Sequence, residues 1–407
     1  MAVGISRPAL EGAATCDSPC SPPDDRPPKP VKITYLIGSL AVGGTEGQLL
    51  QLLSKLDPRR WQTSLILFDR LHIHRVPSRV NGVLSLEIPS TPSRLLVKSW
   101  RMATAARRLA GYLRRLHPDI VHAFLPAACV LAAPAHKLAG VPLLIGSRRS
   151  LVEGYRGSLL VGQADHLATR LCSFMLGNSA AVTEELRTID GIPPGRAVTI
   201  YNGVDTSRFK PGDRSLRQVY GWGEDHVVFG IVANFRPYKR QVDFVRAAAL
   251  IAAQAQQARF LMVGEDRGSL HEVQGEIARH RLESRFVIIP GTAHPELLYP
   301  AMDVYVCSSS TEGFSNVLLE AAACGLPIIA TKTGGNAEVI EEGQTGCLVQ
   351  VGAPEQLAAR ALELLRNPTL RLAWGEASRR RVEASFSIDR MVRNHEALYQ
   401  RLLNRGS

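Results

Sequence analysis

The chain has 407 residues, which is too long for one ordinary domain and predicts two or three. Its hydrophobic content of 45% is typical of a globular protein. The sequence contains no apolar run of about eighteen residues, so no membrane span is predicted. The net charge of +11 indicates an anionic partner, which charge alone leaves open as a small ligand, a membrane or a nucleic acid.

The N-terminal segment, residues 1–30, is rich in proline and lacks an apolar core, so we expect a disordered leader and not a signal peptide. The seven cysteines show no Cys-x-x-Cys spacing and do not indicate a zinc site. Four of them lie in apolar segments and are expected to be reduced core residues of a cytosolic protein: Cys129, Cys172, Cys307 and Cys324.

Short β-branched runs alternate with helical patterns along the rest of the chain, which predicts βαβ units and parallel sheets with helices on both faces. In the first half the predicted strands are Val31–Ile37, Thr63–Phe68, Ile120–Phe124, Leu143–Ile145, Phe174–Gly177 and Val198–Tyr201. In the second half they are Val227–Ala233, Arg259–Val263, Phe286–Pro290, Val304–Ser308, Ile328–Thr331 and Gly346–Val349. Twelve strands are too many for one sheet of usual size.

We therefore expect an α/β protein of two doubly wound, Rossmann-like domains, residues 31–205 and 226–385. A polar linker is predicted over residues 206–225, and a C-terminal helix over 386–407 that returns to the N-terminal domain. Such domains bind ligands at the carboxyl ends of their strands, which predicts a site in the cleft between the halves.

Two features follow strands of the first half. Gly43 and Gly44 lie in a glycine turn between a strand and a helix, the layout in which backbone amides approach a phosphate, although a tight turn without a ligand fits equally. The turn is not a P-loop, because no lysine follows it. His122 stands near the end of its strand, where it is either satisfied by the backbone or exposed in the cleft as a catalytic residue.

Three cations follow the first strand of the second half: Arg236, Lys239 and Arg240. They are either solvated loop charges or a clamp for a diphosphate, in which arginine binds oxygens in pairs and lysine acts as a point charge. In a cleft, such cations would stabilise a leaving diphosphate.

The segment Glu312–Glu320 holds two carboxylates that flank a Gly-Phe-Ser-Asn turn and a short apolar helix. A helix starting at Ser315 to Val317 presents free amides and a positive dipole end, which suits a phosphate, while the carboxylates can accept sugar and ribose hydroxyls. A second glycine turn, Thr333–Glu338, follows the next strand and can add amides from Gly334 and Gly335.

In these residues the chain resembles the retaining glycosyltransferases of family 4, which have the GT-B architecture. The resemblance covers Val31 to about residue 400 and is most specific in the Glu-x7-Glu motif, Glu312 to Glu320. It implies a nucleotide-sugar donor in the C-terminal domain, an acceptor on the N-terminal domain and transfer with retention of configuration.

Carried over by position, the resemblance implies that Glu312 contacts the donor sugar and Glu320 contacts the ribose. It also implies that Arg236 and Lys239 are the basic pair that binds the donor. The other donor-binding positions that it implies are Gly43, Gly44, Gly264, Gly313, Phe314, Ser315, Asn316, Val317, Leu318, Gly334 and Gly335. The chain departs from the family pattern at Phe124, where many members have a second histidine, and at Arg240, where glycine commonly follows the lysine.

No cofactor or metal is expected, because the chain lacks the Asp-x-Asp pair that commonly holds a metal-bound diphosphate. The stretch Arg94–His117 carries many cations with aromatic and aliphatic residues, so it is either a helix on an anionic membrane or a solvated basic helix packed on its own sheet. Its candidate acceptor or membrane contacts are Arg94, Lys98, Trp100, Arg101, Arg107 and Arg108.

The sequence thus favours a cytoplasmic enzyme, either free or peripheral on the inner face of the membrane. It would move a sugar from a nucleotide diphosphate to a lipid-linked, polysaccharide or glycolipid acceptor. One alternative is a GT-B-fold nucleotide-sugar epimerase. A more remote one is a non-enzymatic basic protein that binds a membrane or nucleic acid, although aromatic-interleaved RNA motifs are absent from the sequence.

Overall fold

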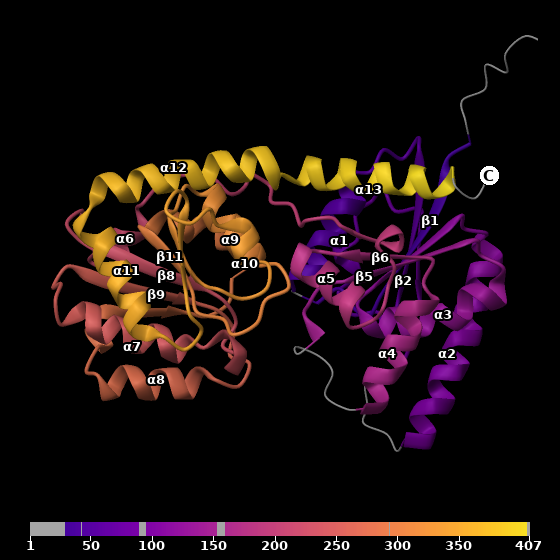
Figure 1. Ribbon diagram of the computed structural model, residues 1–407, viewed down its shortest axis with the longest axis horizontal. Helices are drawn as coiled ribbons and strands as arrows, with labels where there is room; N and C mark the ends of the chain where they lie inside the picture. Colours follow the sequence, from indigo (N-terminus) through magenta and orange to yellow (C-terminus); the bar gives the residue numbers. More distant parts are fainter. Residues whose placement is uncertain (1–28, 42, 89–94, 153–158, 293, 405–407) are drawn as a thin grey trace, which may run out of the picture.

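Two parallel sheets organise the computed structural model, which describes residues 29–41, 43–88, 95–152, 159–292 and 294–404 (Figure 1). The seven-stranded sheet has the order β3-β2-β1-β4-β5-β6-β7, and the six-stranded sheet the order β10-β9-β8-β11-β12-β13. In both orders the chain starts near the middle, builds one side and then crosses to the other, as doubly wound folds do. The predicted fold class is confirmed.

The N-terminal sheet and its helices alternate along the chain. They are β1 (Val31–Ile37), α1 (Gly44–Lys55), β2 (Trp61–Leu67), β3 (Gly82–Ser85), α2 (Leu95–Leu116), β4 (Ile120–Phe124), α3 (Pro126–Ala139), β5 (Leu143–Arg148), α4 (Leu159–Leu171), β6 (Phe174–Gly177), α5 (Ala180–Thr188) and β7 (Ala197–Thr199). Every residue of β4 and β6 is buried, because helices cover both faces of the sheet.

The second half repeats this plan. Its elements are α6 (Leu216–Val219), β8 (Val227–Val232), α7 (Gln241–Ala252), β9 (Ala258–Val263), α8 (Leu270–Arg279), β10 (Phe286–Ile289), β11 (Val304–Cys307), α9 (Asn316–Ala323), β12 (Ile328–Thr331), α10 (Asn336–Val339), β13 (Gly346–Val349), α11 (Pro354–Arg366), α12 (Pro368–Ser385) and α13 (Ile388–Leu403). The twelve predicted strands are present with ends within three residues, and β3 is the one that the sequence did not indicate.

The segment 206–225, predicted to be a polar linker, packs on the second half. Phe209 and Trp222 are buried in the core that underlies α9. Arg217 pairs with Asp303 at the start of β11. The passage from β7 to β8 is therefore part of the second domain's surface layer instead of a loose tether.

The last helix crosses back to the first half, where α13 lies beside α1 while α12 stays on the second half (Figure 1). Met391 and Tyr399 of α13 are buried with the β1 and β2 side chains. The two passages between the halves are bonded together, since Val204 N–H donates to Phe386 O at 2.9 Å and Ile388 N–H donates to Val204 O at 3.2 Å.

Glycine is required at this crossing. A Cβ on Gly203 would lie 2.6 Å from the Cα of Ile388, closer than real contacts allow. The crossing therefore fixes the two domains to each other at one point. The rest of their interface lies at the ends of the strands.

Candidate functional site

Helix α9 begins at the carboxyl end of the second sheet, in the segment that carries the two glutamates. Its first residue is Asn316, within the start predicted from the sequence, and its N-cap Ser315 makes no side-chain cap bond. Ser315 Oγ is buried and has no hydrogen-bond partner among the described residues. The first-turn amides and this hydroxyl are thus hydrogen-bond donors without a partner among the described residues. Because the first turn also contains no acidic residue, the start of α9 attracts an anion.

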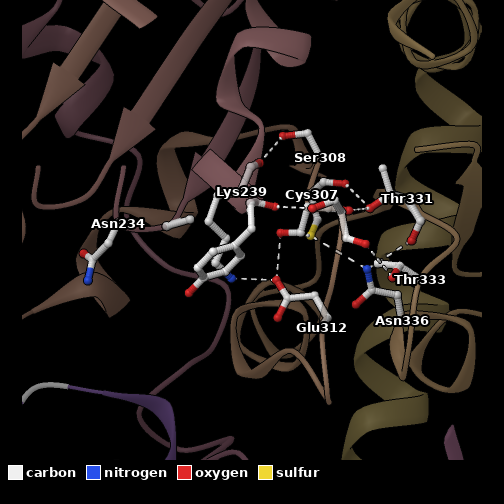
Figure 2. Close-up of polar contacts among 12 residues, drawn as sticks. Asn234, Lys239, Cys307, Ser308, Glu312, Thr331, Thr333 and Asn336 are labelled. Carbon is white, nitrogen blue, oxygen red and sulfur yellow. Dashed lines mark hydrogen bonds and ion pairs between the residues drawn. The ribbon is translucent and has the colours of Figure 1, made fainter. Parts of the chain in front are cut away.

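Glu312 is held by two donors (Figure 2). Its Oε1 accepts from Lys239 Nζ at 2.6 Å and from Ser309 Oγ at 2.7 Å. Burial opposes the charge on Lys239, but the Glu312 carboxylate outweighs it and the pKa of the lysine is raised. The predicted diphosphate lysine is therefore bonded to the predicted sugar carboxylate, and this contact fixes both side chains in the loops that follow β8 and β11.

The other cations of the loop differ from Lys239 in their contacts. Arg236 is exposed and its side chain makes no hydrogen bond or ion pair with the described residues, so its guanidinium is available to a ligand. Arg240 adopts a left-handed φ of 49° and pairs with Asp243 at 2.6 Å. The left-handed backbone explains why glycine is suited to this position, and the ion pair directs Arg240 toward α7.

Glu320 lies one turn into α9. Tyr299 Oη donates to its Oε2 at 2.7 Å. Burial raises the pKa of Glu320 to about 7, although the Tyr299 hydrogen bond acts to lower it. The two glutamates therefore differ: Glu312 is an ion-paired carboxylate, whereas Glu320 changes its charge near neutral pH. The sequence pattern did not indicate Tyr299 or Ser309 as their partners.

Asn316 joins α9 to the N-terminal domain. Its Nδ2 donates to Gly44 O at 3.1 Å, and its Oδ1 accepts from Asn202 Nδ2 at 2.6 Å. Gly44 is the first residue of α1, whose N-cap Gly43 also offers no side-chain cap. The positive ends of two helices from different domains thus meet across one asparagine side chain.

The second glycine turn lies against the Glu312 loop. Gly335 N–H donates to Gly313 O at 3.2 Å. Gly334 has a φ of 45°, a conformation in which its missing Cβ leaves room for Glu312 O. Figure 2 shows the side-chain hydrogen bonds between these two segments. Thr331, Thr333 and Asn336 bond to the end of β11 and to the loop after it.

The remaining donor-side positions lie around these loops. Phe314 and Leu318 are buried in the core, and Val317 is partly buried against it, so only their backbones can serve a ligand. Gly264 follows β9 and packs against Ala233 O, which places it beside the Arg236 loop.

A carboxylate of the second domain caps a helix of the first. Glu338 accepts from Ala180 N at 2.7 Å and from Ala181 N at 3.0 Å, the first amides of α5. The sequence placed Glu338 in the glycine turn but could not show its partner, which lies some 158 residues earlier. This contact and those of Asn316 join the two domains at two places.

His122 lies in the core and not in the cleft. It is completely buried, with its ring nitrogens bonded to Tyr399 Oη at 2.8 Å and Ser147 Oγ at 2.7 Å. Burial, with the nearby His395 and Arg149, lowers the pKa of His122 well below its usual value. The structure therefore corrects the cleft interpretation: a neutral, fully bonded histidine supports the packing of α13 on β4.

The basic stretch forms α2, whose apolar face packs on α3. Leu109 and Leu113 are buried, Arg107 and Arg108 are exposed, and Arg101 is partly exposed. Arg108 Nη1 donates to Leu86 O at 3.0 Å. Arg94 and the side chains of Lys98 and Trp100 lie outside the described residues.

No cluster of three or more His, Cys, Asp or Glu side chains is placed to hold a metal ion within the part of the chain that the structure describes. In the same residues, no helix combines the length and apolar character needed to cross a bilayer.

Two family models match the chain in succession. "Glycosyltransferase Family 4" matches residues 42–208, and "Glycosyl transferases group 1" matches residues 213–381. Together they cover every strand except β1, and they include the segment with the two glutamates.

Curated relatives and solved structures agree with these matches. N-acetyl-alpha-D-glucosaminyl L-malate synthase of Bacillus anthracis is 29% identical over 306 residues, 73% of this chain and 78% of the relative. A GDP-mannose-dependent monoacylated alpha-(1-6)-phosphatidylinositol monomannoside mannosyltransferase of Corynebacterium glutamicum is 26% identical over 86% of this chain and 92% of its own. The structure of Anabaena Alr3699/HepE in complex with UDP has a TM-score of 0.78 at 22% identity and covers 91% of this chain and all of its own, which shows a shared fold.

Proposed function

Because the chain belongs to the family 4 glycosyltransferases, with their GT-B fold, we propose that it moves a sugar from a nucleotide-diphosphate donor to a lipid-linked, polysaccharide or glycolipid acceptor. The donor binds at α9 and the acceptor on the N-terminal half. One observation carries the proposal: the amides at the start of α9 face the start of α1, with Glu312 and Glu320 on either side.

The donor fits this layout part by part. The diphosphate lies at the N-terminus of α9, where the amides of Phe314 to Leu318 and the free Arg236 supply donors and charge. Glu312 accepts sugar hydroxyls while Lys239 holds its carboxylate in place. Glu320 accepts the ribose hydroxyls. As the glycosidic bond breaks, charge builds on the diphosphate, and these fixed donors stabilise it more than the bound substrate.

Transfer with retention of configuration is part of the proposal. The two glutamates are bound as ion-pair or hydrogen-bond acceptors, and neither is assigned as a nucleophile. Attack on the same face as the departing diphosphate, with a phosphate oxygen taking the acceptor's proton, needs no protein nucleophile. The test is the NMR coupling constant of the product's anomeric proton, and an inverted anomer would contradict retention.

Metal independence is proposed on the chemistry of the donors. Arg236, Lys239 and the α9 amides provide the positive partners that a diphosphate needs. Activity is expected to persist in EDTA, and restoration of a lost activity by Mg²⁺ or Mn²⁺ would contradict this.

The relatives' names include a GDP-mannose-dependent enzyme and an L-malate product, so they support a nucleotide sugar without choosing one for this chain. A thermal-shift panel of UDP-, GDP-, ADP- and dTDP-sugars tests the donor site, because a bound ligand stabilises the folded state by mass action. We expect one nucleotide to raise the melting temperature, and a flat panel would count against the proposed function. The epimerase alternative has no support among the relatives described above.

Contact with an anionic membrane is a further part of the proposal that rests on charge alone. The apolar face of α2 is buried, so insertion of this helix is not proposed. Arg107, Arg108 and Arg114 face outward and could hold the protein at a negatively charged surface. Sedimentation with anionic vesicles is expected to be lost at high salt, and no binding at low salt would remove the idea.

A further inference from the structure

Two successive arginines lie at the carboxyl end of strand β5 in the N-terminal sheet, Arg148 as its last residue and Arg149 directly after it, and their surroundings differ. Arg148 is buried among carboxylates and bonds to Asp165 at 3.0 Å and to Asp190. Arg149, at the carboxyl end of the strand, makes no ion pair with the described residues. The charge of the first arginine is balanced within the protein, whereas that of the second is not.

The guanidinium of Arg149 is held in place but incompletely bonded. Its Nη1 donates to Asn202 Oδ1 at 2.6 Å, and its Cζ lies 4.9 Å from the ring centroid of Phe124. Its Nε is buried and has no hydrogen-bond partner among the described residues. Burial lowers the pKa of Arg149 to about 10, so the side chain remains charged at neutral pH.

The neighbours of Arg149 do not neutralise it. His122 and His395 have pKa values lowered by burial and by the arginine, so both are uncharged at neutral pH. Asn178 is 3% exposed and its Oδ1 also lacks a hydrogen-bond partner within the described chain. A narrow recess is lined by Ser147, Arg149, Leu176, Gly177, Asn178, Ile200 and His395.

This recess adjoins the donor segment. The carbonyl oxygen of Arg149 packs so closely on Gly313 that a Cβ there would collide with it. Asn202, the partner of Arg149, also bonds to Asn316 at the start of α9. Arg149 is thus one side chain away from the proposed diphosphate site but belongs to the opposite domain.

We propose that Arg149 binds an anionic group, a phosphate or a carboxylate, of the acceptor. The inference rests on the proposed function, since it names the chemistry of that acceptor. A guanidinium that has no counter-charge and a buried Nε without a hydrogen-bond partner is costly, and an anion that replaces Asn202 or adds to it would satisfy Nε and restore the balance. The donor's diphosphate already has Arg236 and the α9 amides, which leaves the cation of the N-terminal sheet to the second substrate.

Inorganic phosphate is the probe, titrated by calorimetry into the full chain with and without a saturating nucleotide diphosphate from the thermal-shift panel. We expect phosphate to bind in both cases, and Arg149→Gln to weaken that binding at least about 10-fold, as for a lost hydrogen bond to a charged group. The nucleotide's own affinity should stay unchanged. Arg380→Gln, which removes an exposed charge from α12, is the matched control and should bind phosphate as wild type does.

Arg149→Lys is a second variant for the case in which Arg149→Gln fails to fold, since lysine keeps the positive charge but lacks the paired donors of a guanidinium. It should bind phosphate more weakly than wild type. Phosphate affinity that both variants retain would overturn the inference. So would an equal loss of nucleotide affinity, because the guanidinium would then serve the donor. A flat nucleotide panel ends the proposed function, whereas the nucleotide-free phosphate titration still reports on Arg149.

Discussion

At the scale of single residues, the cleft pairs opposite charges before any substrate binds. Lys239 and Glu312 are each largely enclosed, with 17% and 11% of their side chains exposed. Removing one partner leaves the other as a buried charge, which costs more than the pair contributes. The ion pair therefore fixes the Glu312 carboxylate at the place where sugar hydroxyls are proposed to bind.

Glu312→Gln tests this role. Since hydrogen bonds to charged groups contribute about 1.5–3 kcal/mol, we expect kcat/KM for transfer to fall roughly 10- to 100-fold. Steady-state kinetics measure the effect, with the exposed Glu272→Gln on α8 as a control that should leave kinetics unchanged. Wild-type kinetics for Glu312→Gln would remove this glutamate from the site.

Glu320 predicts a pH dependence of stability. Its pKa is raised from 4.5 to about 7 by burial, so the folded chain holds the proton more tightly than the unfolded chain. The stabilisation is complete below about pH 4.5 and is lost as the pH rises through about 7. Denaturant unfolding across this window should show a decline in wild type that is smaller in Glu320→Gln. Identical slopes for both proteins would contradict the raised pKa.

At the scale of elements, α9 shows which features of the site could be predicted from the sequence. The helix start, its free amides and both glutamates follow from local pattern, and the helix begins at Asn316 as expected. The strand β3 was missed because Gly-Val-Leu-Ser is short and only partly buried at a sheet edge, which leaves little apolar signal. Contacts between domains, such as Glu338 with α5, join residues far apart in the chain and leave no periodic trace.

The Glu338 contact predicts a role in holding the domains together. Its carboxylate bonds to two amides and lies at the positive end of α5, a setting in which a negative charge stabilises by about 0.3–2 kcal/mol. Glu338→Ala should open the cleft, with a larger radius of gyration by X-ray scattering and a higher KM for donor. Glu355→Ala, an exposed glutamate on α11, is the control. An unchanged radius and KM would show that the contact is dispensable.

At the scale of the whole molecule, two passages between the domains meet at one hydrogen-bonded crossing. The family resemblance implied the two-domain architecture and it is confirmed, but the crossing appears only when Val204 and Phe386 are placed side by side. Domain motion about this point would bring α1 and α9 together or apart, in the manner of hinge closure.

Gly203→Ala tests the crossing. The added methyl would displace Ile388, and overpacking of this kind costs about 1–3 kcal/mol. We expect a lower melting temperature together with reduced kcat. Gly275→Ala, in helix α8 with open space around it, should instead be neutral or slightly stabilising. Equal behaviour of the two variants would show that the crossing does not need its glycine.

The central claim is that a nucleotide diphosphate binds at the start of α9, facing α1. Amide hydrogen exchange, with and without the nucleotide selected by the thermal-shift panel, tests it most directly. We predict slower exchange from Phe314 to Leu318 and at Gly44, with the exposed face of α2 unchanged. Protection confined to other segments, or none at saturating nucleotide, would contradict the account.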